Sequence, residues 1–129
     1  MHLTDPQRAF LDEVRYAVVG TLNADGSIQQ TVVWFIREGD ELRFTIAARS
    51  AKARNLRRSP TIALTVEDGA RYLTVSGTAV LEPADPDLRL RLAARYLGGE
   101  RAAEWVARRA GVERAGVRIV GRRAYGQGV

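Results

Sequence analysis

The sequence predicts a mainly β protein of the α+β class, in which six antiparallel strands form a small closed barrel with helices at one end and in one insertion. Hydrophobic and polar residues alternate with a period of two over several short stretches, which is typical of strands with one buried face. Short turns rich in Gly, Asp and Asn separate most of these stretches, and such turns join antiparallel neighbours. A length of 129 residues suits a single core, so residues 1–129 are expected to form one domain.

The amino-terminal part of the chain predicts a helix followed by a hairpin. Thr4 and Gln7 have the spacing of a capping box, so we expect a helix over Asp5 to Arg15. Residues 17–22 and the longer segment 27–36 then have the composition of two strands, joined by an Asn-Ala-Asp-Gly turn.

The middle of the chain predicts two strands on either side of a short basic helix. Residues 42–47 alternate strictly between large apolar and smaller or polar side chains, which indicates a third strand. Ser50 can cap a helix that Pro60 stops, and this helix is rich in arginine. Residues 61–67 alternate again and form the fourth predicted strand.

The last third predicts two strands separated by a helical insertion. The fifth strand is expected over Arg71 to Glu82, where Gly77 suggests a bulge or a tight bend. Two helical segments follow, over 88–97 and 101–110, with a pair of glycines between them. The sixth strand is expected over 117–122.

Composition excludes several kinds of chemistry. The chain has no cysteine, and its single histidine is His2, beside the amino terminus. Disulfides, thiolate nucleophiles, zinc–thiolate sites and catalytic triads are therefore excluded, and we expect neither a metal site nor a catalytic side chain. Any reaction must then be performed by a bound organic cofactor, which the protein positions.

Charge and hydropathy limit the partners. The net charge of +5 favours an anionic partner, but basic residues are spread over every predicted element and aromatic residues make up only 7% of the chain. We therefore expect no nucleic-acid binding. No apolar run reaches the length of a membrane span, and the first residues lack the pattern of a signal peptide, so a cytoplasmic protein without a membrane span is expected.

The start of the basic helix is the best candidate for a phosphate site. Ser50 caps the helix, the amides of its first turn lack intrahelical partners, and Arg49 and Lys52 add positive charge beside the positive end of the helix dipole. The alternative is an ordinary solvated helix start. Arg57 and Arg58 lie at the opposite end, where basic side chains complement the dipole without any ligand.

Two strands could carry a flat ring beside this phosphate site. Thr45 and Ala47 form a small, polar face on the third strand. Gln29, Thr31 and Val33 occupy alternate positions on the second strand. The alternative is the polar face of an ordinary antiparallel sheet.

Other conspicuous residues have simpler interpretations. Trp34, Phe35, Phe44 and Leu73 are expected in the core or in a dimer interface rather than around a cofactor. The arginines of the segment 88–109 are expected to form a solvated helical face, and Trp105 would approach the site, if at all, from a partner chain.

The order and spacing of several motifs resemble the pyridoxamine 5'-phosphate oxidase-like split barrels, and within them the oxidoreductases that use the deazaflavin coenzyme F-420. The resemblance covers nearly the whole chain. It rests on Gly20-Thr21-Leu22, Asp25-Gly26, Thr45-Ile46-Ala47, the run from Ser50 to Pro60, Val75 to Ala79, and the last strand ending in Tyr125-Gly126.

The resemblance implies a homodimer that binds a flavin or deazaflavin between two split barrels. The residues that it places at the cofactor are Gln29, Thr31, Val33, Thr45, Ala47, Arg49, Ser50, Ala51, Lys52 and Asn55. The family's carboxyl-terminal Arg-x-His pattern for vitamin B6 substrates is absent, because the chain ends Arg-Ala-Tyr-Gly-Gln-Gly-Val.

The expected function is therefore hydride transfer from reduced F-420 to a small electron-poor acceptor, such as an enone, a quinone or a tetrapyrrole. The many arginines suit the phosphodiester and the acidic tail of F-420. Two alternatives stay open: an oxidoreductase of the same fold that uses flavin mononucleotide (FMN), and a non-catalytic protein that binds or carries the cofactor.

Overall fold

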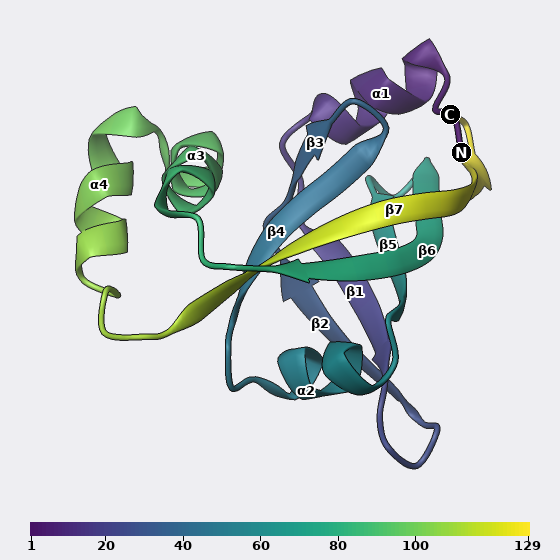
Figure 1. Cartoon of the computed structure of the whole chain (residues 1–129). Coiled ribbons are helices and arrows are strands. Elements are labelled where there is room, and N and C mark those ends of the chain that lie inside the picture. The colour runs from purple at the N-terminus through teal and green to yellow at the C-terminus, as the bar shows by residue number, and fades with distance from the viewer.

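A single curled antiparallel sheet of seven strands forms the centre of the protein, with four helices around it (Figure 1). The computed structural model describes residues 1–129. The strands follow the spatial order β2-β1-β5-β6-β7-β4-β3. Their bounds are β1 (Ala17–Leu22), β2 (Ile28–Val33), β3 (Ile36–Glu38), β4 (Glu41–Ala47), β5 (Thr61–Glu67), β6 (Tyr72–Glu82) and β7 (Arg114–Gln127). The helices are α1 (Asp5–Asp12), α2 (Ala51–Arg58), α3 (Pro86–Leu97) and α4 (Gly99–Ala107).

The expectation of six strands in a closed barrel is wrong. The segment 27–36, expected as one strand, is divided into β2 and β3, and these are the two edges of the sheet, with no hydrogen-bonded ladder between them. Trp34 and Phe35 carry the chain from one edge to the other. The hydroxyl of Tyr96 takes the place of a neighbouring strand there, because it accepts the Phe35 N–H at 3.2 Å and lies 3.3 Å from the Phe35 carbonyl oxygen. The sheet is therefore a half-barrel with a seam.

Helix α1 begins as expected but ends three residues earlier, at Asp12 instead of Arg15. The predicted capping box between Thr4 and Gln7 is present. The Arg95 guanidinium of α3 donates to the carbonyl oxygens of Leu11, Asp12 and Glu13, each at 3.0 Å. These carbonyls thus receive hydrogen bonds from another element rather than from a further turn of helix.

The core lies on the concave side of the sheet and follows the predicted alternation. On β4, Leu42, Phe44 and Ile46 are at most 2% exposed, while the residues between them are half-buried. Phe35 and Leu73 are fully buried too, as expected, but Trp34 is only half-buried. Part of the Trp34 ring is therefore exposed and can line a cavity.

The bulge expected at Gly77 is confirmed. The register between β6 and β7 shifts after Ser76, since Ser76 pairs with Arg123 whereas Gly77 pairs with Gly121. A Cβ atom on Gly77 would lie 2.1 Å from the carbonyl oxygen of Val120, so only glycine allows this close approach.

The insertion is a hairpin of two helices that stands beside the barrel (Figure 1). Gly98, with φ of +88°, ends α3, and α4 ends at Ala107 rather than at the expected residue 110. The chain then enters β7 at Arg114, three residues before the expected start of the last strand, and stays extended to Gln127. This early start places Arg114 opposite Ala47 of β4.

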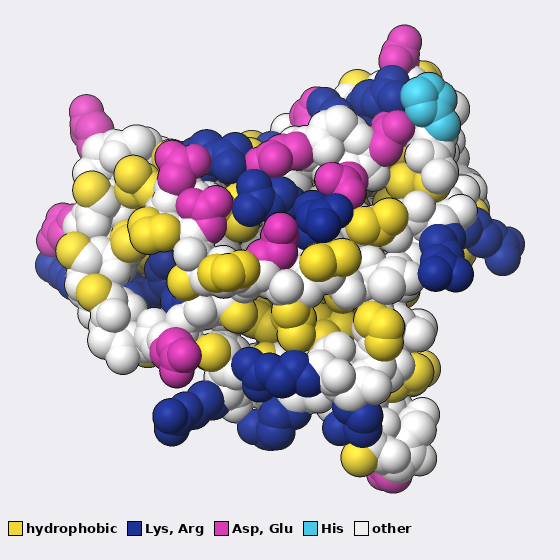
Figure 2. All heavy atoms as spheres, in the orientation of Figure 1, with side chains coloured by type: hydrophobic (Ala, Val, Ile, Leu, Met, Phe, Trp, Pro, Cys, Tyr) yellow, Lys and Arg dark blue, Asp and Glu magenta, His cyan; other side chains and the backbone are white.

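Charged side chains are distributed unevenly over the surface. Figure 2 shows basic side chains gathered along α2 at the bottom of the molecule, whereas acidic and basic side chains intermingle above β7. None of the helices combines the length and the apolar character needed to span a membrane. No three His, Asp or Glu side chains come together in an arrangement that would hold a metal ion.

Candidate functional site

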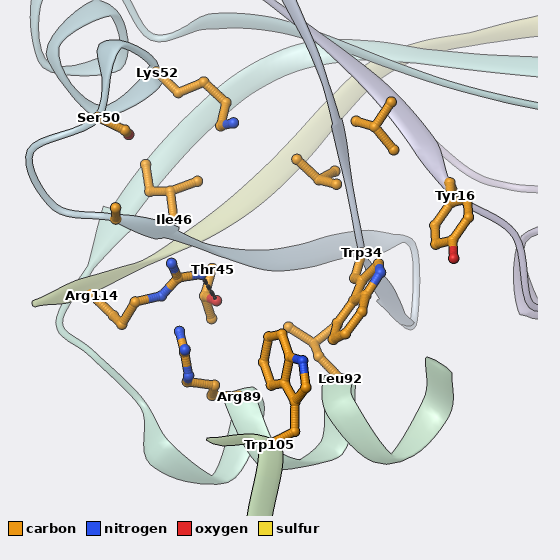
Figure 3. Close-up of a pocket in the computed structure, with 13 residues that line it drawn as sticks. Tyr16, Trp34, Thr45, Ile46, Ser50, Lys52, Arg89, Leu92, Trp105 and Arg114 are labelled. Atoms are coloured by element: carbon orange, nitrogen blue, oxygen red, sulfur yellow. Dashed lines mark hydrogen bonds between the residues drawn. The ribbon is translucent and has the colours of Figure 1, made fainter. Parts of the chain in front are cut away.

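A cavity of about 510 Å³ opens between β2, β4, the start of α2 and the helical insertion (Figure 3). Its size is within the range of cavities that hold a drug-sized ligand. Its walls combine basic, aromatic and small side chains. They are formed by Tyr16, Val32, Val33, Trp34, Thr45, Ile46, Ala47, Ser50, Lys52, Arg89, Leu92, Trp105 and Arg114.

The start of α2 lies at one end of the cavity. Ser50 adopts an extended conformation, and its hydroxyl oxygen accepts the N–H of Ala53 at 3.2 Å, which confirms its role as the cap of α2. The amides of Ala51 and Lys52 have no partner within the helix, because the first turn of any α-helix lacks them. An anion at this end would meet these donors and the positive end of the helix dipole.

Lys52 turns from α2 toward the edge strand β2. Its Nζ donates to the Thr31 hydroxyl at 2.8 Å, and the side chain is half-buried. Burial lowers the pKa of Lys52, and the nearby positive charge of Arg114 lowers it further. The ammonium group keeps donors beyond the one that it gives to Thr31, since it has three.

Arg89 and Arg114 stand at another side of the same cavity (Figure 3). Arg114 Nη2 donates to the Thr45 hydroxyl at 2.7 Å, while its Nε is buried without a hydrogen-bond partner. Burial, together with the neighbouring charge of Arg89, lowers the pKa of Arg114 to about 10. Burial also lowers the pKa of Arg89, with a further contribution from Arg109.

No carboxylate lines this cavity, so its three cations lack acidic partners there. Several half-buried arginines elsewhere are paired with acids. Arg37 lies 2.7 Å from an oxygen of Asp12, and Arg118 lies 2.7 Å from an oxygen of Glu41. Half-buried cations that repel one another are unfavourable without an anion, so the donor set fits a ligand that carries phosphate or carboxylate groups.

Aromatic rings form the remaining wall. The ring centroids of Trp34 and Trp105 are 4.8 Å apart, and Trp34 stacks on Tyr96 at 5.1 Å. Tyr16 continues the row on the other side of Tyr96, at 5.8 Å. Such a wall suits a flat conjugated ligand, because stacked or tilted rings are favoured at these separations.

Five of the ten residues predicted at the cofactor line the cavity. These are Val33, Thr45, Ala47, Ser50 and Lys52. Two more lie beside them, since Thr31 contacts Lys52 and Ala51 follows Ser50 in the first turn of α2.

The other three predicted residues lie outside the lining. Arg49 is exposed. Asn55 is 5% exposed and donates to Thr21 at 3.0 Å and to Asn23 at 2.9 Å, which ties α2 to β1. Gln29 is the next member of this network, because its Oε1 accepts the Thr21 hydroxyl at 3.4 Å. Contact of these three residues with a ligand stays a prediction.

Sequence reasoning missed the contribution of the insertion. Arg89, expected on a solvated helical face, lines the cavity, and Trp105 reaches it from the same chain rather than from a partner. No local sequence pattern indicates Arg114 as a site residue. Arg89 and Trp105 could have been found as two large side chains on the two helices of one insertion. The position of Arg114 depends on the register of β7 against β4, which no local pattern gives.

Comparisons with known proteins agree with this architecture. The pyridoxamine 5'-phosphate oxidase family matches residues 3–124. A biliverdin reductase from Mycobacterium tuberculosis that depends on reduced coenzyme F-420 is 36% identical over 99 residues, which are 73% of this chain and 72% of that protein.

Solved structures extend the similarity over almost the whole chain. A conserved hypothetical protein from Mycobacterium tuberculosis has a TM-score of 0.79 at 27% identity and covers 96% of this chain and 84% of its own. A structure described as an F-420 reductase has a TM-score of 0.78 at 26% identity, over 95% and 98% of the two chains. A heme storage protein from Vibrio cholerae, at 20% identity, 97% and 94% coverage and a TM-score of 0.70, shares the fold alone. The half-barrel, the match over residues 3–124 and the 36% identical relative together assign this chain to the pyridoxamine 5'-phosphate oxidase family of oxidoreductases.

Proposed function

We propose that the protein is an F-420-dependent oxidoreductase that reduces a small, flat, electron-poor acceptor such as an enone, a quinone or a tetrapyrrole. One observation carries the proposal: a cavity beside the capped start of α2 holds three half-buried cations and no acid. The 36% identical relative is named for the same cofactor, and for a tetrapyrrole as its substrate.

Ser50, Lys52 and the first-turn amides of α2 are the groups that would hold the cofactor phosphodiester. Thr45 and Ala47 of β4, with Val33 of β2, offer a small surface for the ring. The bound reduced deazaflavin supplies the hydride, so the side chains need to bind, orient and exclude water. Hydride transfer by the cofactor needs no catalytic side chain, and the cavity lining indeed has no histidine, carboxylate or thiol.

Fluorescence titration tests the cofactor directly. Trp34 and Trp105 are the two tryptophans of the chain, and both line the cavity, so a bound chromophore will quench them. We expect F-420 to bind at least ten times more tightly than FMN. Lys52→Ala should weaken F-420 binding about tenfold, since a charge-assisted hydrogen bond contributes roughly 1.5–3 kcal/mol.

Arg122→Gln is the matched control, because it removes one exposed positive charge on β7, away from the cavity lining. Its affinity for F-420 should stay within twofold of the wild type. The proposal would be ruled out if Lys52→Ala bound F-420 as tightly as the wild type does, or if the wild type bound FMN more tightly than F-420. Oxidation of reduced F-420 by biliverdin, menadione or cyclohexenone then separates an enzyme from a carrier, which would bind without turnover.

We also propose that the protein acts as a homodimer. Val18, Ile28 and Val32 lie on the convex face of β1 and β2 and are 38%, 68% and 62% exposed. Val32 also lines the cavity, so a second copy on this face would lie at the cavity mouth. Ile28→Asp should shift the mass measured by light scattering toward the monomer, whereas Ala103→Asp on exposed α4 should not.

A further inference from the structure

Two of the three cations in the cavity come from elements other than α2. Arg89 comes from α3 and Arg114 is the first residue of β7, so they belong to segments that meet only in the fold. Figure 3 shows both side chains extending toward the space beside Thr45, apart from the start of α2. The two residues line the same two cavities, and their mutual repulsion contributes to the lowered pKa of Arg114.

These two arginines are incompletely satisfied by the protein. Arg89 forms no ion pair or hydrogen bond, and its guanidinium lies over the Trp105 ring, 5.5 Å from the centroid. Arg114 has one hydrogen bond, to Thr45, and a buried Nε with none. By contrast, Arg43 on the same strand as Thr45 reaches Glu38 at 3.3 Å and Asp85 at 3.4 Å.

The arginine pair also borders a second cavity, of about 700 Å³. This cavity shares Thr45, Arg89 and Arg114 with the first, and its wall contains both further arginines, Arg57 and Arg109, and three acids, Glu82, Asp85 and Glu113. A carboxylate held by the pair is therefore expected on the side of the first cavity, whose lining has no acid. Because Arg89 and Arg114 line two neighbouring cavities, they differ from solvated arginines on a helix surface.

We propose that Arg89 and Arg114 form a second anion site, separate from the α2 phosphate site, that binds a carboxylate of the bound ligands. This inference rests on the proposed function for the identity of those ligands. Planar guanidinium groups with unused donors match the two oxygens of a carboxylate, which binds them through paired hydrogen bonds. The carboxylate comes either from the acceptor, lying near the aromatic wall, or from the glutamate tail of the cofactor.

Two pairs of probes distinguish these sources. Biliverdin, which carries two carboxylates, is compared with its uncharged dimethyl ester. F-420 with its glutamate tail is compared with F-420 that carries no glutamate. Dissociation constants for all four are measured by tryptophan quenching in the wild type, in Arg89→Gln and Arg114→Gln, and in the control Arg122→Gln.

If the acceptor supplies the carboxylate, Arg89→Gln weakens biliverdin about tenfold, leaves the ester within twofold, and leaves both forms of F-420 unchanged. If the cofactor tail supplies it, the same variant weakens only the F-420 that carries glutamates. Either result supports the site and names its ligand. Arg89 lies on a helix at the surface of the fold, so its variant keeps the test valid even if Arg114→Gln folds poorly.

The proposal is overturned if Arg89→Gln changes no probe by more than twofold, or if it weakens acid and ester equally and both forms of F-420 equally. Failure of the proposed function looks different. A wild-type protein that binds neither form of F-420 contradicts that function, while the comparison of biliverdin with its ester still decides the role of Arg89.

Discussion

Lys52 Nζ lies 2.8 Å from the hydroxyl oxygen of Thr31, so the basic start of α2 is linked to the edge strand β2 across the mouth of the cavity. The contact joins residues 21 positions apart in the chain. It orients the ammonium group before any ligand arrives and leaves two of its three donors for that ligand. Preorganisation of this kind lowers the entropic cost of binding.

Thr31→Val tests this orientation. Valine keeps the shape of threonine but removes the hydroxyl, so Lys52 loses its partner and its fixed direction. We expect F-420 to bind about threefold more weakly, within the range of a single neutral hydrogen bond. Thr61→Val, on the exposed start of β5, is the matched control and should have no effect on the titration. Unchanged binding in Thr31→Val would contradict the orienting role of the hydroxyl, and tighter binding would mean that the hydroxyl competes with the ligand for Lys52.

Affinity for anionic ligands should fall as the pH rises toward 10. The pKa of Arg114 is lowered to about 10, and the pKa of Lys52 is lowered from its ordinary value of 10.5. Arg114 loses its charge as the pH rises through about 10, and Lys52 loses its charge at a lower pH than an ordinary lysine, so attraction for phosphate or carboxylate weakens in the alkaline range. Titration of F-420 from pH 8 to 10.5 at constant ionic strength should give a rising dissociation constant.

Circular dichroism at each pH keeps this result separate from unfolding. Lys52→Arg should flatten part of the pH dependence, because an ordinary arginine stays protonated over this range. A dissociation constant that is constant up to pH 10.5 would contradict the loss of charge on Lys52 and Arg114 as the source of weaker binding.

Gly77→Ala should destabilise the half-barrel strongly. The added Cβ would lie 2.1 Å from the Val120 carbonyl oxygen and 2.9 Å from the Gly121 Cα, both of which are backbone atoms that cannot move aside alone. We expect a loss of about 2–3 kcal/mol, which corresponds to a fall in Tm of roughly 10 °C. Gly111→Ala has open space around its Cβ and should leave Tm nearly unchanged in the same calorimetric measurement.

Tyr96→Phe should loosen the seam of the half-barrel. The hydroxyl donates to the Arg15 carbonyl at 2.7 Å and accepts the Phe35 N–H at 3.2 Å, so its loss leaves two half-buried backbone groups without their partner. We expect a cost of about 1–2 kcal/mol and faster hydrogen exchange at the Phe35 amide. Tyr72→Phe, at an exposed position of β6, should change neither quantity.

The alternation of apolar and polar residues correctly predicted strands that have one buried and one more exposed face. The bounds of β1 and β5 agree with the predicted segments 17–22 and 61–67, because each has a regular alternation between turn residues. The same rule failed over 27–36. Alternation shows that a segment is extended, but it does not show which neighbour the segment pairs with, so the crossing from one sheet edge to the other at Trp34 and Phe35 was invisible.

The candidate site was half predictable for a similar reason. Ser50 and Lys52 follow from the capping pattern of one short helix, and Thr45 and Ala47 follow from one strand. Arg114 reaches Thr45 across 69 residues of sequence, through a ladder whose register depends on the whole sheet. Patterns within short windows carry no information on such a contact.

The role of Tyr96 at the seam has a consequence for how relatives of this fold can diverge. Its hydroxyl holds the junction of the two sheet edges, while Leu92 and Arg89 of the same helix α3 face the cavity. A change that tilts or shifts α3 to admit a bulkier ligand would therefore also pull on the junction. Ligand range and integrity of the sheet are mechanically linked here, so new specificity is more easily reached through side-chain exchange on α3 and α4 than through repositioning the helices.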